Sequence, residues 1–308
     1  TTLPKKLSTK AKKAIEEYGV AQFNKECKES VWEYTDVWEK FTERIGFWVD
    51  QENPYITYHN DYIESVWNVI KEANKQDLLY KDYKVVPWCP RCGTGLSSHE
   101  LAQGYQDVKD LSVTAKFKVK GQENTYILAW TTTPWTLPGN VALAIEKKID
   151  YVKVKVAEEY LILAKARIGI LSEGFEIIEE LKGKDLIGLE YEPLYPYLEN
   201  TISDKEKEKM GKAYKVYNAD FVTTEDGTGI VHIAPSFGAD DFRVAKQNGI
   251  GSLTLVNRQG KFVEAVTDFA NEFVKEDYLN ADEKEAERLK QGRDKYLSVD
   301  ERISIKLK

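Results

Sequence analysis

The sequence predicts an α+β fold, in which a helical N-terminal segment is followed by a barrel-like β domain. Apolar residues in the first part recur at alternating spacings of three and four, which is helical periodicity. From residue 112 the period becomes two, and many short apolar runs alternate with turn residues, as in small β barrels. A chain of 308 residues with 42% hydrophobic side chains can bury one large core or two modest ones.

Residues 8–76 are predicted to be helical. Gly19 ends the first helix, Pro54 interrupts the run, and a further helix begins near Asn60 or Asp61. Between these breaks, apolar side chains form one helical stripe that we interpret as core: Val31, Tyr34, Trp38, Phe41, Ile45 and Trp48. A surface on which nucleic-acid bases stack is the alternative interpretation.

The β domain is predicted from strict alternation over residues 112–119 and from a hairpin connection at 121–124. Further strands are expected at 125–129, 152–156, 160–163, 221–222 and 253–256. Residues 240–248 and 281–293 are predicted to be helical, and residues 298–308 end in alternating apolar and polar side chains.

Composition limits the function classes. A formal net charge of −7 argues against broad phosphate neutralisation, so any contact with nucleic acid should be local. No apolar run has membrane-spanning length, and the first residues carry neither an initiator Met nor a secretory core, which suggests an excised piece. Three cysteines cannot all pair within one chain, so we expect a reducing, cytoplasmic setting. We also expect a monomer.

Residues 130–140 combine four threonines with turn-forming residues after a predicted strand. The hydroxyls are those of Thr131, Thr132, Thr133 and Thr136. Pro134 and Pro138 remove backbone donors and Gly139 permits a sharp turn, which predicts a shaped loop that binds something small and polar. The alternative is an ordinary strand, because threonine favours strands.

A second segment, residues 226–242, also sets polar groups among turn formers. Asp240 and Asp241 follow Gly238 at the start of a predicted helix, where capping alone would explain one carboxylate. His232 lies nine residues before Asp241, and a histidine in a strand is often structural.

Residues 88–94 contain a CxxC knuckle. Cys89 and Cys92 supply half of a tetrahedral zinc site, and neither Cys27 nor His99 completes the set by its spacing. A folded knuckle without zinc is therefore the prediction.

Together these segments resemble the editing domain of the class I aminoacyl-tRNA synthetases. The wording Trp-Thr-Thr-Thr-Pro-Trp-Thr-Leu-Pro-Gly-Asn at residues 130–140 is similar to the isoleucyl group, whereas the leucyl and valyl groups carry Thr-Thr-Arg-Pro there. Residues 88–94 and 96–100 resemble the same group, so the likeness covers the whole chain.

The resemblance implies a β-barrel editing domain inserted between helical and connective segments of a synthetase. The expected divisions are a helical segment of the synthetase body (1–83), a cysteine knuckle with its connection (84–106), the editing domain (107–275) and a return segment (276–308). The expected reaction is hydrolysis of valine from tRNA(Ile). Valine and isoleucine differ by one methylene, and these synthetases are themselves the usual illustration that such a difference needs a second sieve.

By the same resemblance, Asp241 receives the α-ammonium of the wrong amino acid. Thr132, Thr133 and His232 are the other expected catalytic residues, although whether His232 acts as a base is left open. Thr131, Trp135 and Thr136 are expected to bind the substrate, which is the 3′ end of tRNA(Ile) carrying valine. Hydrolysis of this ester needs no cofactor.

The chain lacks the His-Ile-Gly-His and Lys-Met-Ser-Lys-Ser signatures, so it should not activate isoleucine. ATP and magnesium are expected only in the intact enzyme, where the resemblance also places a cysteine pair that would complete a zinc site. Two alternatives stay open: the editing domain of a valyl or leucyl enzyme, and a non-catalytic module that binds the tRNA end.

Overall fold

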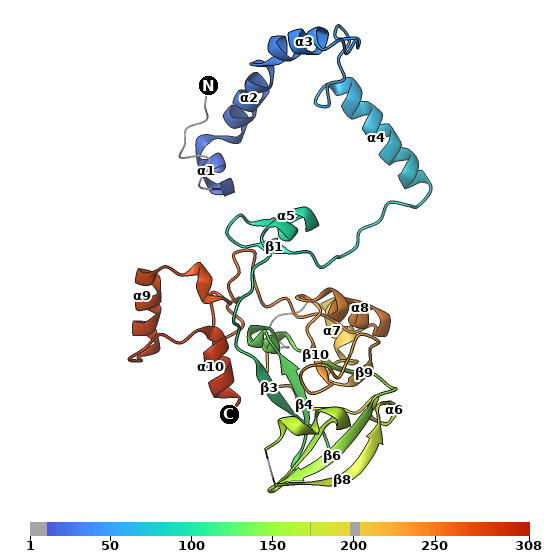
Figure 1. The fold of residues 1–308 in the computed structure, drawn as a ribbon, viewed down its shortest axis with the longest axis vertical. Coiled ribbons are helices and arrows are strands. Elements are labelled where there is room, and N and C mark those ends of the chain that lie inside the picture. Colours follow the sequence, from blue (N-terminus) through green and yellow to red (C-terminus); the bar gives the residue numbers. More distant parts are fainter. Residues whose placement is uncertain (1–10, 173, 198–203) are drawn as a thin grey trace. The chain divides into compact units, whose positions relative to one another are not determined.

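The computed structural model describes residues 11–172, 174–197 and 204–308 (Figure 1). The chain forms two compact units, Thr1–Lys84 and Val85–Lys308. Helices dominate the described part of the first unit and a curled sheet dominates the second, which confirms the predicted α+β class. The finer division into four segments stays a prediction.

The first unit contains four helices among its described residues, in agreement with the helical periodicity. They are α1 (Ala11–Tyr18), α2 (Val20–Trp32), α3 (Thr35–Arg44) and α4 (Asn60–Lys75). Gly19 separates α1 from α2 with a φ of 104°, a conformation that favours glycine because it has no Cβ. The predicted break there is confirmed.

The prediction that the apolar stripe of residues 31–48 is core is wrong. Val31 lies in α2 and Trp38 and Phe41 lie in α3, whereas the other three residues lie outside both helices. All six side chains are between 51% and 88% exposed. α2, α3 and α4 bury none of their residues. A helical stripe becomes core only where a second layer packs on it, and the described residues of the first unit supply no such layer.

The second unit contains an eight-stranded sheet in the order β8-β6-β7-β4-β10-β5-β9, with β3 paired to β4. Its strands are β3 (Val113–Lys118), β4 (Thr125–Thr131), β5 (Ala142–Ile145), β6 (Asp150–Val156), β7 (Glu159–Ala164), β8 (Phe175–Lys182), β9 (Val216–Asn218) and β10 (Val231–Ile233). The alternation predicted for β3 is confirmed, since Ala115 and Phe117 are buried while Lys116 and Lys118 are exposed.

Part of this sheet closes on itself, as predicted for a barrel-like domain. Residues 190–191 lie between the end of β3 and the start of β9, through the bridges of Val119 with Tyr191 and of Glu190 with Lys215. The ring β3-β4-β10-β5-β9 is thereby completed, and β7, β6 and β8 extend from β4 (Figure 1). Large buried side chains fill the ring: Phe117, Ile127, Leu143, Ile145, Tyr191 and Ile233.

The position of the candidate site follows from the pairing of β4 with β10. These strands are parallel, with Val231 opposite Trp130, so the segments that leave them emerge at the same edge of the sheet. Two glycines just before β10 allow the backbone to pass close to the end of β7 and to the ring of Trp130 in β4. A Cβ on Gly229 would lie 2.4 Å from the Cβ of Ala164, and one on Gly227 would lie 2.8 Å from the Trp130 ring.

Short helices connect and follow the strands: α5 (Ser98–Gln103), η1 (Pro134–Gly139), η2 (Lys165–Ile170), α6 (Gly183–Leu186), α7 (Asp204–Met210), α8 (Ala239–Asn248), η3 (Glu276–Tyr278), α9 (Ala281–Gln291) and α10 (Val299–Lys306). The predicted helices at 240–248 and 281–293 are confirmed. None of the helices in the described ranges is both long and apolar enough to cross a membrane.

Two strand predictions are wrong. Residues 221–222 lie in a turn region, and residues 253–256 form only one bridge, between Val256 and Phe262. Leu253 and Leu255 are nevertheless buried, so their apolar character reflects burial without regular pairing. The alternating tail is the helix α10, which begins with a capping box formed by Ser298 and Glu301.

Candidate active site

The threonine loop, residues 131–140, leaves β4 and turns at once into η1. The backbone N–H of Thr133 donates to Oγ1 of Thr131 at 3.1 Å, and the two hydroxyl oxygens are 3.3 Å apart. The hydroxyl of Thr136 donates to the carbonyl of Thr133 at 2.8 Å and lies 3.4 Å from its hydroxyl. Three of the four predicted hydroxyls therefore form one network, while Thr132 is exposed.

His232 on β10 joins this network from the neighbouring strand. Its Nε2 lies 3.0 Å from Oγ1 of Thr136, and the residue is 6% exposed. The single hydroxyl proton of Thr136 is used in its bond to the Thr133 carbonyl, so this pattern assigns the proton of the imidazole to Nε2. Nδ1 is then a buried acceptor, and it has no hydrogen-bond partner.

Burial lowers the pKa of His232 to about 4, so the imidazole is neutral at physiological pH. In the unfolded chain the same group would titrate near 6.5. Between these values only the unfolded chain binds the proton, so the contribution of His232 to stability is present above pH 6.5 and is lost as the pH falls toward 4.

This linkage predicts how a variant should respond to pH. His232→Gln keeps a donor for Thr136 but cannot titrate. We expect the difference in free energy of unfolding between the original chain and the variant to shrink by roughly 2–3 kcal/mol from pH 7.5 to pH 4.5. Urea unfolding of both chains at several pH values measures this difference. Both chains contain Asp241, so the effect of its titration on the free energy of unfolding cancels in the difference. A difference independent of pH would contradict a buried neutral His232.

Asp241 lies in the first turn of α8, where its Oδ2 accepts a hydrogen bond from the N–H of Ala234 at 2.9 Å. Burial raises the pKa of this carboxyl to about 6, although the Ala234 bond opposes the shift. A Cβ on Gly238 would lie 2.8 Å from the carboxyl carbon, so glycine leaves room for the carboxylate. The neighbouring Asp240 differs, because it is exposed and pairs with Arg243 at 3.1 Å.

The segment that carries Asp241 packs against the threonine loop. The rings of Trp135 and Phe237 meet edge to face with centroids 4.9 Å apart. A Cβ on Gly139 would approach the Phe237 ring to 3.0 Å, so the loop and the second segment are in close contact. Nε1 of Trp135 is buried without a hydrogen-bond partner. Two unpartnered polar atoms, on Trp135 and His232, therefore lie beside this loop.

Sequence reasoning missed two residues that hold the loop. Asn140 is buried, accepts a hydrogen bond from the Tyr191 hydroxyl at 2.6 Å and donates to the carbonyl of Ala142 at 2.8 Å. Its position directly after Pro138 and Gly139, where the loop ends, was the sequence signal that could have marked Asn140 as a residue that holds the loop. The other is Asp300, which accepts from the N–H of Trp135 at 2.8 Å, and no local pattern links these two positions.

The cysteine knuckle is formed by β1 (Trp88–Cys89) and β2 (Thr94–Gly95). The N–H of Cys92 donates to Sγ of Cys89 at 3.3 Å, and Nε1 of Trp88 donates to the carbonyl of Arg258 at 2.8 Å. Across the described ranges no group of three or more His, Cys, Asp or Glu side chains could hold a metal ion. The two thiols do not make a complete zinc site, and the metal content stays a prediction.

The sequence of this chain matches a family model and is similar to known proteins. The family model of "tRNA synthetases class I (I, L, M and V)" matches residues 1–291. The chain is 53% identical to an isoleucine–tRNA ligase of Clostridium acetobutylicum over 96% of its own length and 27% of that protein. It is 51% identical to one of Cytophaga hutchinsonii over 94% of its own length and 29% of that protein. The chain thus spans about a quarter of these relatives.

A solved structure with a related shape is the editing domain of a cytosolic leucyl-tRNA synthetase from P. knowlesi. It has a TM-score of 0.34 and 16% identity over 45% of this chain and 62% of that one.

Proposed function

We propose that this chain, which belongs to the class I tRNA synthetases of the I, L, M and V group, hydrolyses valine from mischarged tRNA(Ile). The observation that carries the proposal is a half-buried carboxylate, Asp241, in a segment packed against a loop of linked hydroxyls. The relatives named isoleucine–tRNA ligase support the isoleucyl assignment. Attachment of isoleucine with ATP and magnesium would belong to the whole enzyme.

Asp241 is the proposed partner of the substrate's α-ammonium. With a pKa of about 6, the carboxyl is mostly ionised at neutral pH, and a bound ammonium favours the ionised form further. A charge-assisted hydrogen bond in a partly desolvated position orients its partner strongly. The bond from Ala234 holds one carboxylate oxygen, which leaves the other for the substrate.

The hydroxyls of the threonine loop are the proposed ligands of the ester and of a water molecule. In the reaction, the water oxygen attacks the carbonyl carbon, the bond from that carbon to the ribose oxygen breaks, and a proton passes from the water to the ribose oxygen. Free valine and tRNA result. Thr133 and the exposed Thr132 would position the water or the ribose hydroxyl, and this positioning supplies most of the rate enhancement.

His232 serves this site as a neutral group. Its low pKa makes it a poor proton acceptor at neutral pH, so it is not the general base of this proposal. Its Nε2–H instead fixes the oxygen of Thr136, whose own proton is directed to the Thr133 carbonyl. We assign it the role of holding the loop in one hydrogen-bonded arrangement.

The proposed selectivity is steric. The indole of Trp135 packs on Phe237 and the adjacent Gly139 has no space for a side chain, so this wall of the site is rigid. A rigid wall that admits valine would reject the additional methylene of isoleucine, a difference worth roughly 1–3 kcal/mol.

Hydrolysis of Val-tRNA(Ile) and of Ile-tRNA(Ile) by the 308-residue chain tests this function. We expect release of valine at a rate at least 10-fold above that of isoleucine, which follows from the value of one methylene. Equal rates for the two esters would contradict the selectivity. No hydrolysis of either ester by the folded chain would contradict the proposed function.

The alternative of a non-catalytic module predicts a different result in the same assay, namely retention of Val-tRNA(Ile) on the protein without hydrolysis. If the chain were the editing domain of a valyl or leucyl enzyme, it should hydrolyse other mischarged tRNAs faster than Val-tRNA(Ile). We further propose that hydrolysis requires no cofactor and that the chain acts as a monomer in the cytoplasm.

A further inference from the structure

The backbone of the threonine loop is held by a residue far away in the sequence. The N–H of Trp135 donates to Oδ1 of Asp300 at 2.8 Å, across a separation of 165 residues. Pro134 has no N–H, so Trp135 supplies the first backbone donor of η1, and the start of a helix offers no partner for it. Asp300 takes that place with a side chain that is almost fully buried.

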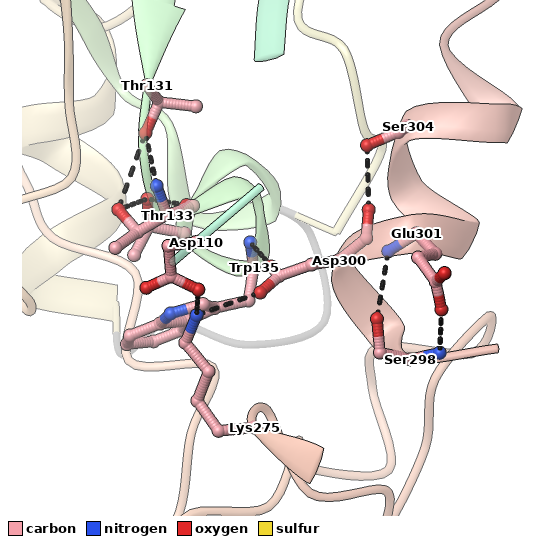
Figure 2. A network of polar contacts seen from close by, with 10 residues as sticks. Asp110, Thr131, Thr133, Trp135, Lys275, Ser298, Asp300, Glu301 and Ser304 are labelled. Carbon is pink, nitrogen blue, oxygen red and sulfur yellow. Dashed lines mark hydrogen bonds and ion pairs between the residues drawn. The ribbon is translucent and has the colours of Figure 1, made fainter. Parts of the chain in front are cut away.

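Asp300 is itself held from two sides (Figure 2). Lys275 lies 3.0 Å from its Oδ2 and 2.7 Å from Oδ1 of Asp110, so one ammonium joins two carboxylates from different parts of the chain. The start of α10 is fixed by reciprocal bonds between Ser298 and Glu301. We refer to Asp110, Lys275 and Asp300 as the Asp300 network.

The three members of this network lie outside the barrel. Asp110 precedes β3, Lys275 precedes η3, and Asp300 is in α10, whereas their common target is the loop that leaves β4. Burial raises the pKa of Asp300, while Lys275 and the Trp135 amide oppose the rise. The ammonium of Lys275 thus compensates a carboxylate that would be costly to bury alone.

We propose that Asp300 is a positioning residue for the editing reaction, which fixes the threonine loop at Trp135 and, through Lys275 and Asp110, ties it to both segments flanking the barrel. Trp135 lies between Thr133 and Thr136, so a shift of its backbone alters the arrangement of both hydroxyls. The effect on the rate of hydrolysis rests on the proposed function, whereas the effect on the structure of the loop does not.

Three variants separate the acceptor role from general stability. Asp300→Ala removes the acceptor and the ion pair with Lys275, Asp300→Asn loses the ion pair but keeps an oxygen that can accept from Trp135, and Ser304→Ala is the control. The Ser304 hydroxyl donates to the carbonyl of Asp300 at 2.8 Å, so it lies in the same helix without bonding to the loop.

The first readout is hydrogen exchange of peptides that cover residues 131–140. We expect faster exchange in Asp300→Ala, a smaller increase in Asp300→Asn, which keeps the acceptor but not the ion pair, and no change in Ser304→Ala. The second readout is the hydrolysis of Val-tRNA(Ile). A displaced loop should lower kcat by roughly 10–100-fold with KM changed less than about threefold, because positioning rather than affinity is lost. Asp300→Asn should restore most of kcat.

Unchanged exchange and kcat in Asp300→Ala would overturn the proposal, as would an Asp300→Asn variant as impaired as Asp300→Ala. If thermal melting shows that Asp300→Ala does not fold, Asp300→Asn and Lys275→Met decide. Each keeps an oxygen for the Trp135 bond but breaks the ion pair with Lys275, so both should lose part of the protection of residues 131–140, and full protection in both would overturn the proposal. If the original chain hydrolyses neither ester, the proposed function fails, and the exchange measurement still tests the positioning.

Discussion

Hydrolysis of Val-tRNA(Ile) by the Asp241→Ala variant is expected to fall by roughly 100-fold or more in kcat/KM. The variant removes the carboxylate proposed to receive the substrate's ammonium, so the ester is no longer oriented toward the threonine hydroxyls. It also leaves the N–H of Ala234 without its acceptor. Single-turnover deacylation, with release of labelled valine as the signal, measures the loss.

Two further variants separate charge from structure at this position. Asp241→Asn retains an oxygen for the Ala234 bond but has no charge for an ammonium, so it should fold normally and hydrolyse at least about 10-fold more slowly. Asp240→Ala is the matched control, because Asp240 is the adjacent residue in the same helical turn yet is exposed. Deacylation by Asp241→Asn at the original rate would remove Asp241 from the proposed mechanism.

The site derives from a simple topological feature. β4 and β10 are parallel neighbours, and each is followed by a segment that cannot continue as a strand because it contains proline and glycine. Parallel neighbours end at the same edge of a sheet, so two segments about a hundred residues apart in sequence meet there. The loop supplies hydroxyls and the second segment supplies a carboxylate at a helix start, where free amides favour it.

Much of this site could be predicted from the sequence because its signals are local. The loop is marked by Pro134, Pro138 and Gly139, and the helix start is marked by Gly238 before Asp241. The period-two pattern of β3 likewise follows from neighbours in the chain. Which residues bond to one another across the fold has no such signal, so the contact of Thr136 with His232 required the structure.

The failures have two origins: contacts between residues far apart in the sequence, and, for the C-terminal tail, two local signals that disagree. Asp300 belongs to a sequence, Ser298 to Glu301, that indicates a helix start and nothing else, so its bond to Trp135 was not predictable. The alternation of residues 303–307 resembles a strand, but the capping box at Ser298 and the burial of Ile303 make it a helix. The stripe of residues 31–48 has the composition of a core, but the described residues of the first unit do not pack on it.

Thr136→Val is expected to lower the rate of Val-tRNA(Ile) hydrolysis by roughly 10–100-fold and to destabilise the fold by about 1–3 kcal/mol. Valine has nearly the same shape as threonine, so the change removes the hydroxyl without opening a cavity. Nε2–H of His232 then loses its acceptor, and since Nδ1 already has no partner, a buried imidazole is left with both nitrogens unsatisfied. The carbonyl of Thr133 loses one donor as well.

Thr136→Ser is the matched control for this prediction. It keeps the hydroxyl and loses only a methyl group, so the bonds to Thr133 and His232 can form and most of the activity should remain. Urea unfolding and deacylation of all three chains, measured in parallel, compare the two effects. If Thr136→Val were as active and as stable as Thr136→Ser, the hydroxyl of Thr136 would not connect His232 to the loop in solution, and His232 would have no role in positioning it.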